Sequence, residues 1–284
     1  MNASGWNTLV QPEAVAPALA TAEVVLVDCR FSLSDPLAGE RAYDASHLPG
    51  ARYAHLDRDL SGPPASGQGR HPWPDAAAFC GRLSAWGVSP RSRVVAYDDG
   101  DGAFAARLWC LLRMLGHETV AVLDGGWARW TALGLPVDAE RPLPAPVPYE
   151  ARFDGGRLLD CDAVARHLAH GGLLLDARAS ERFRGAVEPL VPVAGHVPGA
   201  LNRPFTTNLE AGRFRPAAQL RAEFDAVLDG RAPQDLVVMC GSGVTACHHL
   251  LALEHAGLHG AKLFAGSWSA WVSDRSRPVA TGVG

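Results

Sequence analysis

One cysteine lies in a loop of small residues between an apolar segment and a segment of helical composition. Residues 240–245 read Cys-Gly-Ser-Gly-Val-Thr; they follow the apolar residues 236–239 and precede residues 246–255. Such a loop can turn consecutive backbone N–H groups toward the sulfur, and the following helix adds the positive end of its dipole. Both effects favour the thiolate, the nucleophilic form of cysteine. We therefore expect Cys240 to be a nucleophile. The loop residues expected to surround its bound sulfur are Gly241, Gly243, Val244 and Thr245.

Cys240 could instead be a small buried apolar residue, as most free cysteines are. A core position would require neither the two glycines of the loop nor the hydroxyls of Ser242 and Thr245. We therefore favour the functional interpretation.

Length and composition limit the number of domains and the classes of partner that the chain can have. The 284 residues suffice for two domains, each with a core of its own. The net charge is −4 and the 26 basic residues are scattered, so we expect no nucleic-acid partner. We also expect no membrane association, since the chain has neither a long apolar run nor the features of a signal peptide at its start. The six cysteines form no C-x-x-C pair and no disulfide-type spacing, which favours a cytoplasmic location.

The two halves of the chain repeat the same motifs in the same order. These are Asp-x-Arg, His-x-Pro-Gly-Ala and a segment containing two tryptophans. The paired positions are 28–30 with 176–178, 47–51 with 196–200, and 124–130 with 265–271. Between the copies, four prolines within residues 141–149 favour an extended connector. We therefore predict a first domain at 1–140, a proline-rich linker at 141–149 and a second domain at 150–284.

Within each copy, short apolar segments alternate with segments of helical periodicity. Residues 94–97 and 120–123 are nearly continuous apolar runs, as buried parallel strands are. The predicted helices include 75–86, 103–115, 160–170 and 217–228. Gly116 and Gly257 lie where we expect helices to end before the next strand. The pattern predicts an α/β fold in which each domain is a mainly parallel sheet with helices on both faces.

The first copy has Asp98 at the position that matches Cys240. An aspartate cannot accept a sulfur atom. We therefore predict that the first domain is non-catalytic and that the second domain carries the chemistry.

Together these motifs resemble those of two-domain sulfurtransferases of the rhodanese type, across essentially the whole chain. Residues 240–245 are similar to the active loop of the 3-mercaptopyruvate branch, whereas the thiosulfate branch typically has Cys-Arg-Lys-Gly-Val-Thr. The resemblance implies tandem rhodanese-like domains. It also implies transfer of sulfane sulfur from 3-mercaptopyruvate, or thiosulfate, through a persulfide on Cys240. The acceptor would be cyanide, a small thiol or a thioredoxin-like protein, and no metal or organic cofactor is implied.

The resemblance also assigns roles to residues outside the cysteine loop. Ser242 would form an acid–base relay with His71 and Asp57 of the first half of the chain, and Arg182 would bind the donor. One departure concerns residues 188–191, where the mercaptopyruvate branch usually continues to a second arginine and this chain has none. Arg184 is a possible substitute, and a preference for thiosulfate stays open.

Two other classes of function compete with this interpretation. A cysteine phosphatase requires an arginine at the end of its loop, but Ala246 and Cys247 follow here. A non-enzymatic sulfur carrier or redox module would need Cys240 but no acid–base relay. Cys247 could resolve an oxidised Cys240, although we expect its side chain to face away.

Four histidines also invite a metal-site interpretation. They are His248, His249, His255 and His259. Their spacing matches no zinc-binding pattern, so we interpret them as polar residues of a helix face.

Overall fold

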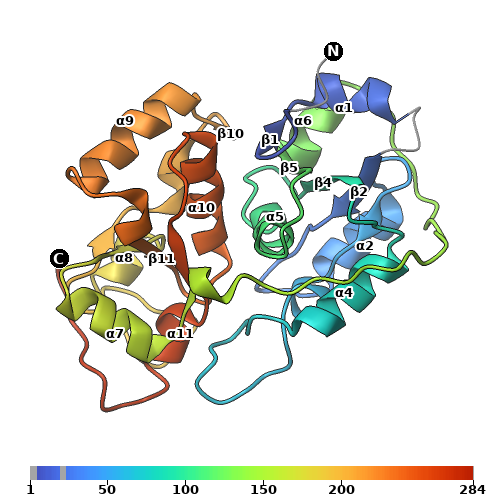
Figure 1. The fold of residues 1–284 in the computed structure, drawn as a ribbon. Helices are drawn as coiled ribbons and strands as arrows, with labels where there is room; N and C mark the ends of the chain where they lie inside the picture. The colour runs from blue at the N-terminus through green and yellow to red at the C-terminus, as the bar shows by residue number, and fades with distance from the viewer. Residues whose placement is uncertain (1–4, 20–23, 284) are drawn as a thin grey trace. The chain divides into compact units, whose positions relative to one another are not determined.

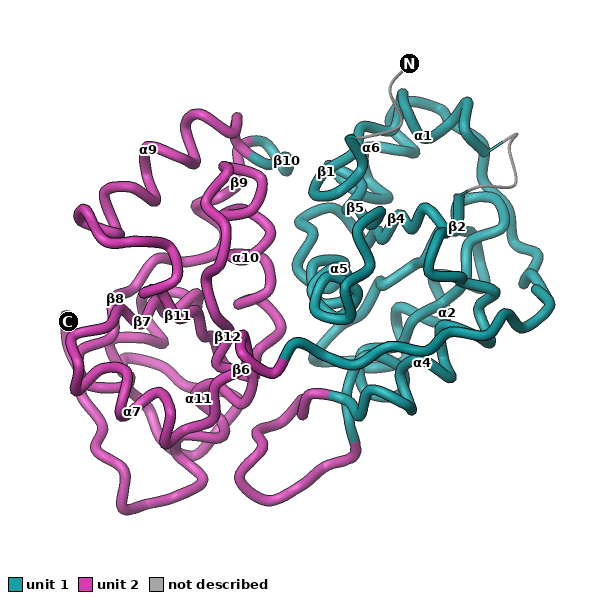
Figure 2. Tube along the Cα trace, in the orientation of Figure 1, with its two compact units in different colours: residues 1–62, 74–154, 211–214 teal, residues 63–73, 155–210, 215–284 magenta. Residues whose placement is uncertain are grey.

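The computed structural model describes residues 5–19 and 24–283 of the chain (Figure 1). The chain divides into two compact units (Figure 2). Unit 1 contains the residues up to Gly62, Pro74–Asp154 and Ala211–Phe214; unit 2 contains Pro63–Trp73, Gly155–Glu210 and the residues from Arg215 onward. The proline-rich residues 141–149 therefore belong to unit 1, and a short segment from the first half of the chain belongs to unit 2.

Unit 1 is built on a five-stranded sheet whose paired strands are all parallel, in the order β1-β5-β4-β2-β3. Its strands are β1 (Leu9–Val10), β2 (Val24–Asp28), β3 (Arg52–Tyr53), β4 (Arg93–Tyr97) and β5 (Val120–Leu123). Its helices are α1 (Pro12–Ala18), α2 (Ala38–Ala45), α3 (Leu56–Asp59), α4 (Ala76–Ala85), α5 (Ala105–Met114) and α6 (Gly126–Ala132). The short strand β10 (Arg213–Phe214) also belongs to this unit.

Unit 2 repeats this arrangement, with parallel strands in the order β6-β12-β11-β7-β8. Its strands are β6 (Leu158–Leu159), β7 (Leu173–Asp176), β8 (Leu201–Asn202), β9 (Leu209–Glu210), β11 (Leu236–Met239) and β12 (Lys262–Phe264). Its α-helices are α7 (Cys161–Ala169), α8 (Ser180–Phe183), α9 (Ala217–Leu228), α10 (Thr245–His255) and α11 (Ser267–Trp271). Three 3₁₀ turns complete it: η1 (Gly155–Arg157), η2 (Phe205–Asn208) and η3 (Pro233–Asp235). The predicted α/β fold with parallel sheets and a duplicated unit is confirmed.

Local sequence explains where several helices begin and end. The side chain of Asp75 accepts a hydrogen bond from the N–H of Ala78 at the start of α4, and Asp160 caps α7 in the same way. Such caps satisfy N–H groups that have no partner inside the helix. Gly116 and Gly257 follow the ends of α5 and α10 with positive φ angles, as predicted.

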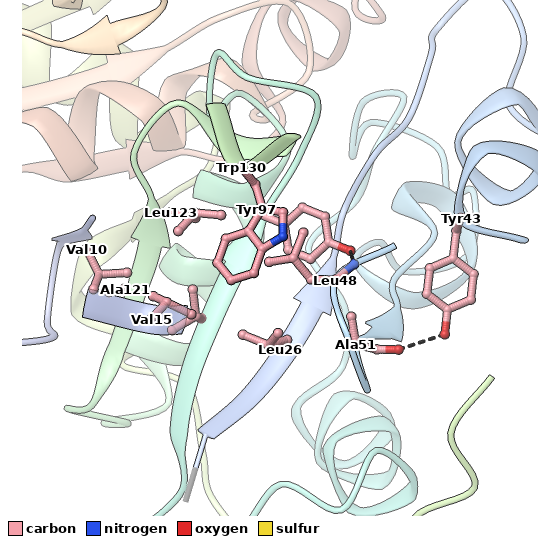
Figure 3. Packing of buried hydrophobic residues seen from close by; sticks show 11 residues of the cluster. Val10, Val15, Leu26, Tyr43, Leu48, Ala51, Tyr97, Ala121, Leu123 and Trp130 are labelled. Carbon is pink, nitrogen blue, oxygen red and sulfur yellow. Dashed lines mark hydrogen bonds between the residues drawn. The ribbon is translucent and has the colours of Figure 1, made fainter. Parts of the chain in front are cut away.

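The core of unit 1 packs against one face of its sheet (Figure 3). Trp130 of α6 is fully buried against residues of β2 and β5, and Tyr97 accepts a hydrogen bond from the N–H of Leu48 at 3.1 Å. Truncation of a buried aromatic side chain of this kind costs about 3–5 kcal/mol of folding free energy. The equivalent cluster of unit 2 contains Trp268 and Trp271.

The repeated Asp-x-Arg motif has a structural role in both units. Arg178 donates to Asp176 at 2.6 Å, and its guanidinium lies 4.8 Å from the ring centroid of Trp268. The matching contacts in unit 1 join Asp28, Arg30 and Trp127. Because each buried carboxylate is paired and each guanidinium covers an indole, the motif joins the end of β2 or β7 to the tryptophan-containing helix of the same unit.

Within the described parts of the chain, no helix combines the length and the apolar character that a membrane crossing requires.

Candidate active site

Cys240 lies at the carboxyl end of the central strand β11, where residues 241–244 lead into α10. This end of a parallel sheet is where binding sites form in α/β proteins. The thiol is buried, with 2% of the residue exposed, and its Sγ accepts a hydrogen bond from the N–H of Gly243 at 3.2 Å. A backbone donor is therefore directed at the sulfur, and it stabilises negative charge there without supplying a labile proton.

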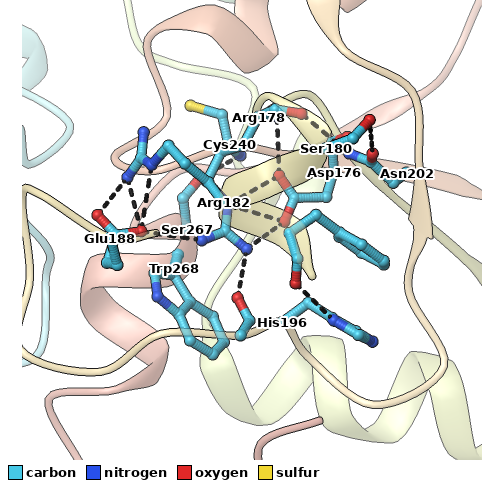
Figure 4. Close-up of polar contacts among 12 residues, drawn as sticks. Asp176, Arg178, Ser180, Arg182, Glu188, His196, Asn202, Cys240, Ser267 and Trp268 are labelled. Atoms are coloured by element: carbon cyan, nitrogen blue, oxygen red, sulfur yellow. Dashed lines mark hydrogen bonds and ion pairs between the residues drawn. The ribbon is translucent and has the colours of Figure 1, made fainter. Parts of the chain in front are cut away.

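The first residues of α11 hold the cysteine loop in place (Figure 4). The N–H of Cys240 donates to Ser267 Oγ at 3.0 Å, and the N–H of Trp268 donates to the carbonyl of Cys240 at 3.0 Å. The N–H of Ser269 donates to the carbonyl of Gly241 at 3.0 Å. Ser267 has a φ of +52°, a left-handed conformation that costs a side-chain-bearing residue about 1–2 kcal/mol. This cost is offset by the bond that its hydroxyl makes to the loop.

The two glycines of the loop are required for different reasons. Gly243 has a φ of +78°, and a Cβ there would lie 2.1 Å from the carbonyl oxygen of Ala265. At Gly241 a Cβ would lie 3.3 Å from Nη2 of Arg182 and 3.6 Å from Nη2 of Arg70. The first glycine therefore permits the backbone path, and the second leaves space beside two guanidinium groups.

The structure brings together Ser242 and His71, which are 171 positions apart in sequence. Nδ1 of His71 lies 2.7 Å from Ser242 Oγ, and both residues are buried, at 5% and 4% exposure. His71 is on the segment Pro63–Trp73 of unit 2, which is anchored by the N–H of Arg70 donating to Ser269 Oγ at 3.1 Å. A neutral imidazole and a hydroxyl in this geometry can exchange a proton.

Asp57 lies in unit 1, on α3, with its residue exposed to solvent. Its backbone N–H donates to Nδ1 of His55 at 3.1 Å. Its part in a relay with His71 stays a prediction.

Arg182 is held by a carboxylate beside the cysteine loop. Its Nη2 lies 2.7 Å from Oε1 of Glu188, which also pairs with Arg178 at 3.3 Å (Figure 4). Among the described residues, Nη1 of Arg182 donates to no protein group, and it lies 3.5 Å from the Cβ position of Gly241. One edge of the guanidinium is thus fixed by Glu188 and the other is available to a ligand at Cys240. Arg184, the possible substitute, is 41% exposed and pairs with Glu181 instead.

Arg70 is a site residue that the sequence analysis missed. Its Nη2 and that of Arg182 lie within 3.6 Å of the same point above Gly241. Two guanidinium groups therefore lie beside the backbone that follows Cys240, and that of Arg182 is paired with Glu188. The only signal in the sequence was the position of Arg70 directly before His71. A lone arginine in a loop has no spacing that distinguishes it from a surface residue.

Two histidines of α10 correct an expectation. His248 and His249 are fully buried, and Nδ2 of Asn208 lies 3.0 Å from Nδ1 of each ring. Burial lowers the pKa of His249 to about 3. The interpretation of these two as residues of a polar helix face is therefore wrong, because α10 is buried along the turn that carries them. Among residues 5–19 and 24–283, no group of His, Cys, Asp and Glu is arranged to hold a metal ion.

Cys247 contributes to the geometry of the cysteine loop. Its thiol is buried and donates to the carbonyl oxygen of Gly243 at 3.2 Å. Because the N–H of Gly243 donates to Cys240, this contact helps to fix the residue that faces the reactive sulfur.

Asp98 occupies the corresponding loop of unit 1. Its carboxylate accepts hydrogen bonds from four backbone N–H groups at 2.9–3.1 Å; the donors are Gly100, Gly102, Phe104 and Ala105. Burial raises the pKa of Asp98 to about 7, against the lowering effect of these donors. The loop of unit 1 is therefore filled by its own side chain, where unit 2 has a thiol.

The chain matches the family model of the rhodanese-like domain twice, over residues 11–133 and 160–274. It belongs to the rhodanese family. The tandem domains expected from the resemblance are therefore confirmed.

Several relatives of the chain are named sulfurtransferases. A Pseudomonas aeruginosa protein named a probable 3-mercaptopyruvate sulfurtransferase is 49% identical, over 96% of this chain and 98% of the relative. A thiosulfate sulfurtransferase of Cricetulus griseus is 35% identical, over 81% and 79%. The structure of 3-mercaptopyruvate sulfurtransferase from Leishmania major superposes with a TM-score of 0.81 at 32% identity, over 95% of this chain and 75% of that one. Sulfur transfer is accordingly the activity of this chain, with a small-molecule donor and acceptor.

Proposed function

We propose that this sulfurtransferase takes sulfur from 3-mercaptopyruvate and carries it as a persulfide on Cys240. The observation that carries the proposal is the 2.7 Å hydrogen bond between His71 and Ser242 in the cysteine loop. Removal of sulfur from mercaptopyruvate leaves an enolate, which needs a proton. Removal of sulfur from thiosulfate leaves sulfite, which needs none. A buried imidazole–hydroxyl pair is therefore useful for the first donor and superfluous for the second.

The first half-reaction begins with attack of the Cys240 thiolate on the sulfur of mercaptopyruvate. A sulfur–sulfur bond forms, the carbon–sulfur bond breaks, and its electron pair goes to carbon to give the pyruvate enolate. The Ser242 hydroxyl donates a proton to that carbon and regains one from His71. The persulfide releases one proton when it ionises, and this proton balances the one that the enolate consumed. Cys240 then holds an anionic persulfide stabilised by the N–H of Gly243.

In the second half-reaction a nucleophilic acceptor attacks the outer sulfur of the persulfide. The sulfur–sulfur bond breaks and its electrons return to Cys240 as thiolate. We infer that the acceptor is cyanide, a small thiol or a thioredoxin-like protein, each of which supplies a nucleophile of this kind. We also infer a reducing cytoplasm, since all six cysteines are free thiols.

Arg182 and Arg70 bind the donor in this proposal. The carboxylate of mercaptopyruvate is a planar anion, and a guanidinium edge binds it with two charge-assisted hydrogen bonds. Gly241 leaves the space in which that carboxylate lies. Gly243, Val244 and Thr245 form the loop around the sulfur, and we propose that Asp57 orients the imidazole of His71.

We infer that residues 150–284 form the catalytic copy and that the copy within residues 1–140 is non-catalytic, with 141–149 as the linker. The four N–H groups around Asp98 support this assignment, because the loop that would cradle a persulfide is already filled by an anion.

Thiosulfate is the second candidate donor, and the paired guanidinium groups of Arg182 and Arg70 favour it. Two guanidinium groups can donate hydrogen bonds to a dianion even without the basic residues that follow the cysteine in the thiosulfate branch. A sulfur carrier or redox module is the third alternative, and it would have no use for the contact between His71 and Ser242.

Steady-state turnover with each donor against cyanide separates these functions. We expect a preference for mercaptopyruvate over thiosulfate. Turnover with mercaptopyruvate should be abolished in Cys240→Ser and reduced at least tenfold in His71→Ala. His170→Ala is the matched control, because His170 is an exposed histidine of the same unit whose ring bonds to the backbone carbonyl of Arg166. A preference for thiosulfate that survives His71→Ala would favour the second candidate. Absence of turnover with both donors would favour the carrier.

A further inference from the structure

Unit 1 contains a cavity of about 480 Å³ that is remote in sequence from the cysteine loop. Its walls come from α2, α3, α4, β3 and the start of the proline-rich segment, which passes along α4 in Figure 1. Its lining includes Arg52, Arg58, Arg82, Arg141, Tyr53 and Leu143. A volume of this size fits a small organic molecule, since ligand pockets measure roughly 300–1,000 Å³.

Arg52 is the central feature of this cavity. Its Nε donates to the carbonyl of Trp86 at 2.9 Å and its Nη1 donates to the carbonyl of Gly50 at 2.6 Å. Within the described residues it forms no ion pair with a carboxylate. Burial lowers its pKa, as expected for a guanidinium that is partly desolvated without an acidic partner. Two backbone carbonyls therefore fix the side chain and leave its positive charge uncompensated.

The other charges around the cavity do not remove this excess. Arg58 pairs with Glu40 at 2.6 Å and Arg82 pairs with Asp59 at 2.9 Å. Four arginines and two carboxylates line the cavity, and Arg141 also pairs with Asp44 at 2.6 Å, so Arg52 is the lining arginine whose charge stays uncompensated among the described residues. An uncompensated positive charge on a partly desolvated side chain attracts anionic ligands.

The remainder of the wall is apolar. Leu143 is 97% exposed, so a large apolar side chain lies at the cavity without a covering group. The hydroxyl of Tyr53 donates to the carbonyl of Arg30 at 3.0 Å, and the hydroxyl of Tyr43 donates to Ala51 at 2.7 Å. Since both hydroxyls are engaged by the backbone, the rings present carbon to the cavity.

We propose that this cavity binds an organic dianion that has a compact anionic group and a flat apolar group, as in an aryl phosphate. The anionic group pairs with Arg52 and the neighbouring guanidiniums, and the apolar group packs between Tyr53 and Leu143. The site is independent of the chemistry at Cys240, and nothing in the sulfur-transfer mechanism uses its residues.

Titration calorimetry of the full chain with phenyl phosphate tests this proposal. We expect saturable binding with one molecule per chain, weaker binding of inorganic phosphate, and still weaker binding of phenol. Arg52→Met should weaken binding of phenyl phosphate at least tenfold, because it removes the uncompensated charge and keeps the apolar stem. Arg91→Gln is the matched control, since Arg91 is an exposed arginine of the same unit outside the cavity, and it should leave the affinity unchanged.

Two further variants keep the test decisive. Leu143→Ser alters an exposed side chain and should not affect folding, yet it should weaken phenyl phosphate and leave inorganic phosphate unchanged. Arg182→Gln should leave binding unchanged, which separates this site from the anion-binding groups at Cys240. Equal affinity in the wild type and in both cavity variants would overturn the proposal, as would loss of binding in Arg182→Gln. Turnover of sulfur donors is not a readout here, so failure of either proposal leaves the other intact.

Discussion

Replacement of Ser242 by alanine removes one oxygen atom from the proposed relay and leaves every backbone N–H group of the cysteine loop in place. Ser242 Oγ lies 2.7 Å from Nδ1 of His71, and the residue is 4% exposed, so water replaces it poorly. A positioned general acid contributes about 10²–10⁴-fold to rate. Because His71 stays in place, we expect the low end of that range, about 100-fold in kcat with mercaptopyruvate, or roughly 2.7 kcal/mol of transition-state stabilisation.

The same substitution should leave thiosulfate turnover within about threefold, since sulfite leaves without a proton. Loss of the buried hydrogen bond costs about 1–3 kcal/mol of folding free energy, so the variant should remain folded at assay temperature. The assay is steady-state formation of thiocyanate from each donor, with thermal unfolding measured in parallel. Ser273→Ala is the matched control, because it removes a hydroxyl that bonds to a carbonyl within the same unit at 2.7 Å.

The outcome that would refute the reasoning is an equal fall in turnover with both donors. That result would assign Ser242 to the shape of the loop and not to proton transfer. Unchanged turnover with mercaptopyruvate would remove it from the mechanism altogether.

Three other perturbations test the geometry of the second unit. Gly243→Ala should abolish turnover with both donors, because its Cβ would lie 2.1 Å from a backbone oxygen. Gly171 has a similar φ of +80° without the clash, so Gly171→Ala should keep activity. An active Gly243→Ala variant would contradict the loop geometry. Arg182→Gln should raise KM for mercaptopyruvate about 10–100-fold, since charge-assisted bonds contribute roughly 1.5–3 kcal/mol each, whereas the exposed Arg184→Gln should not. His249 has a pKa lowered from 6.5 to about 3, so the unfolded chain binds its proton first as pH falls, and stability present above pH 6.5 is lost toward pH 3. Chemical denaturation should show that the free energy of unfolding falls between about pH 7 and about pH 5 by roughly 2 kcal/mol less in His249→Gln than in the wild type. An identical fall in both proteins would contradict the burial argument.

The fold was predictable from the sequence because the same motifs occur in the same order in both halves of the chain. Continuous apolar runs such as residues 94–97 are typical of strands buried on both faces, and the repeated motifs fix an equal strand order in both halves. The motif residues themselves turned out to be structural: Arg178 pairs with Asp176, and the imidazole of His196 stacks on Phe183 at 3.8 Å. The residues repeated in both halves therefore serve the packing of each unit and not the chemistry at Cys240.

The candidate site was only partly predictable. Cys240 was evident from its loop, but nothing local indicates that His71 contacts Ser242, and that expectation came from family resemblance alone. Arg70 and Glu188 were missed as site residues because their roles depend on which side chains lie beside them, not on a spacing. His248 and His249 were misinterpreted because a buried helix with polar residues has the same sequence pattern as an exposed one.

The proposed mechanism requires that Cys240 carries the transferred sulfur. Intact-protein and peptide mass spectrometry after addition of 3-mercaptopyruvate, without an acceptor, measures this directly. We expect a gain of the mass of one sulfur atom on the peptide that contains Cys240, its disappearance on addition of cyanide, and no gain in Cys240→Ser. A gain on any other cysteine, or turnover without a sulfur-bearing Cys240, would contradict the mechanism.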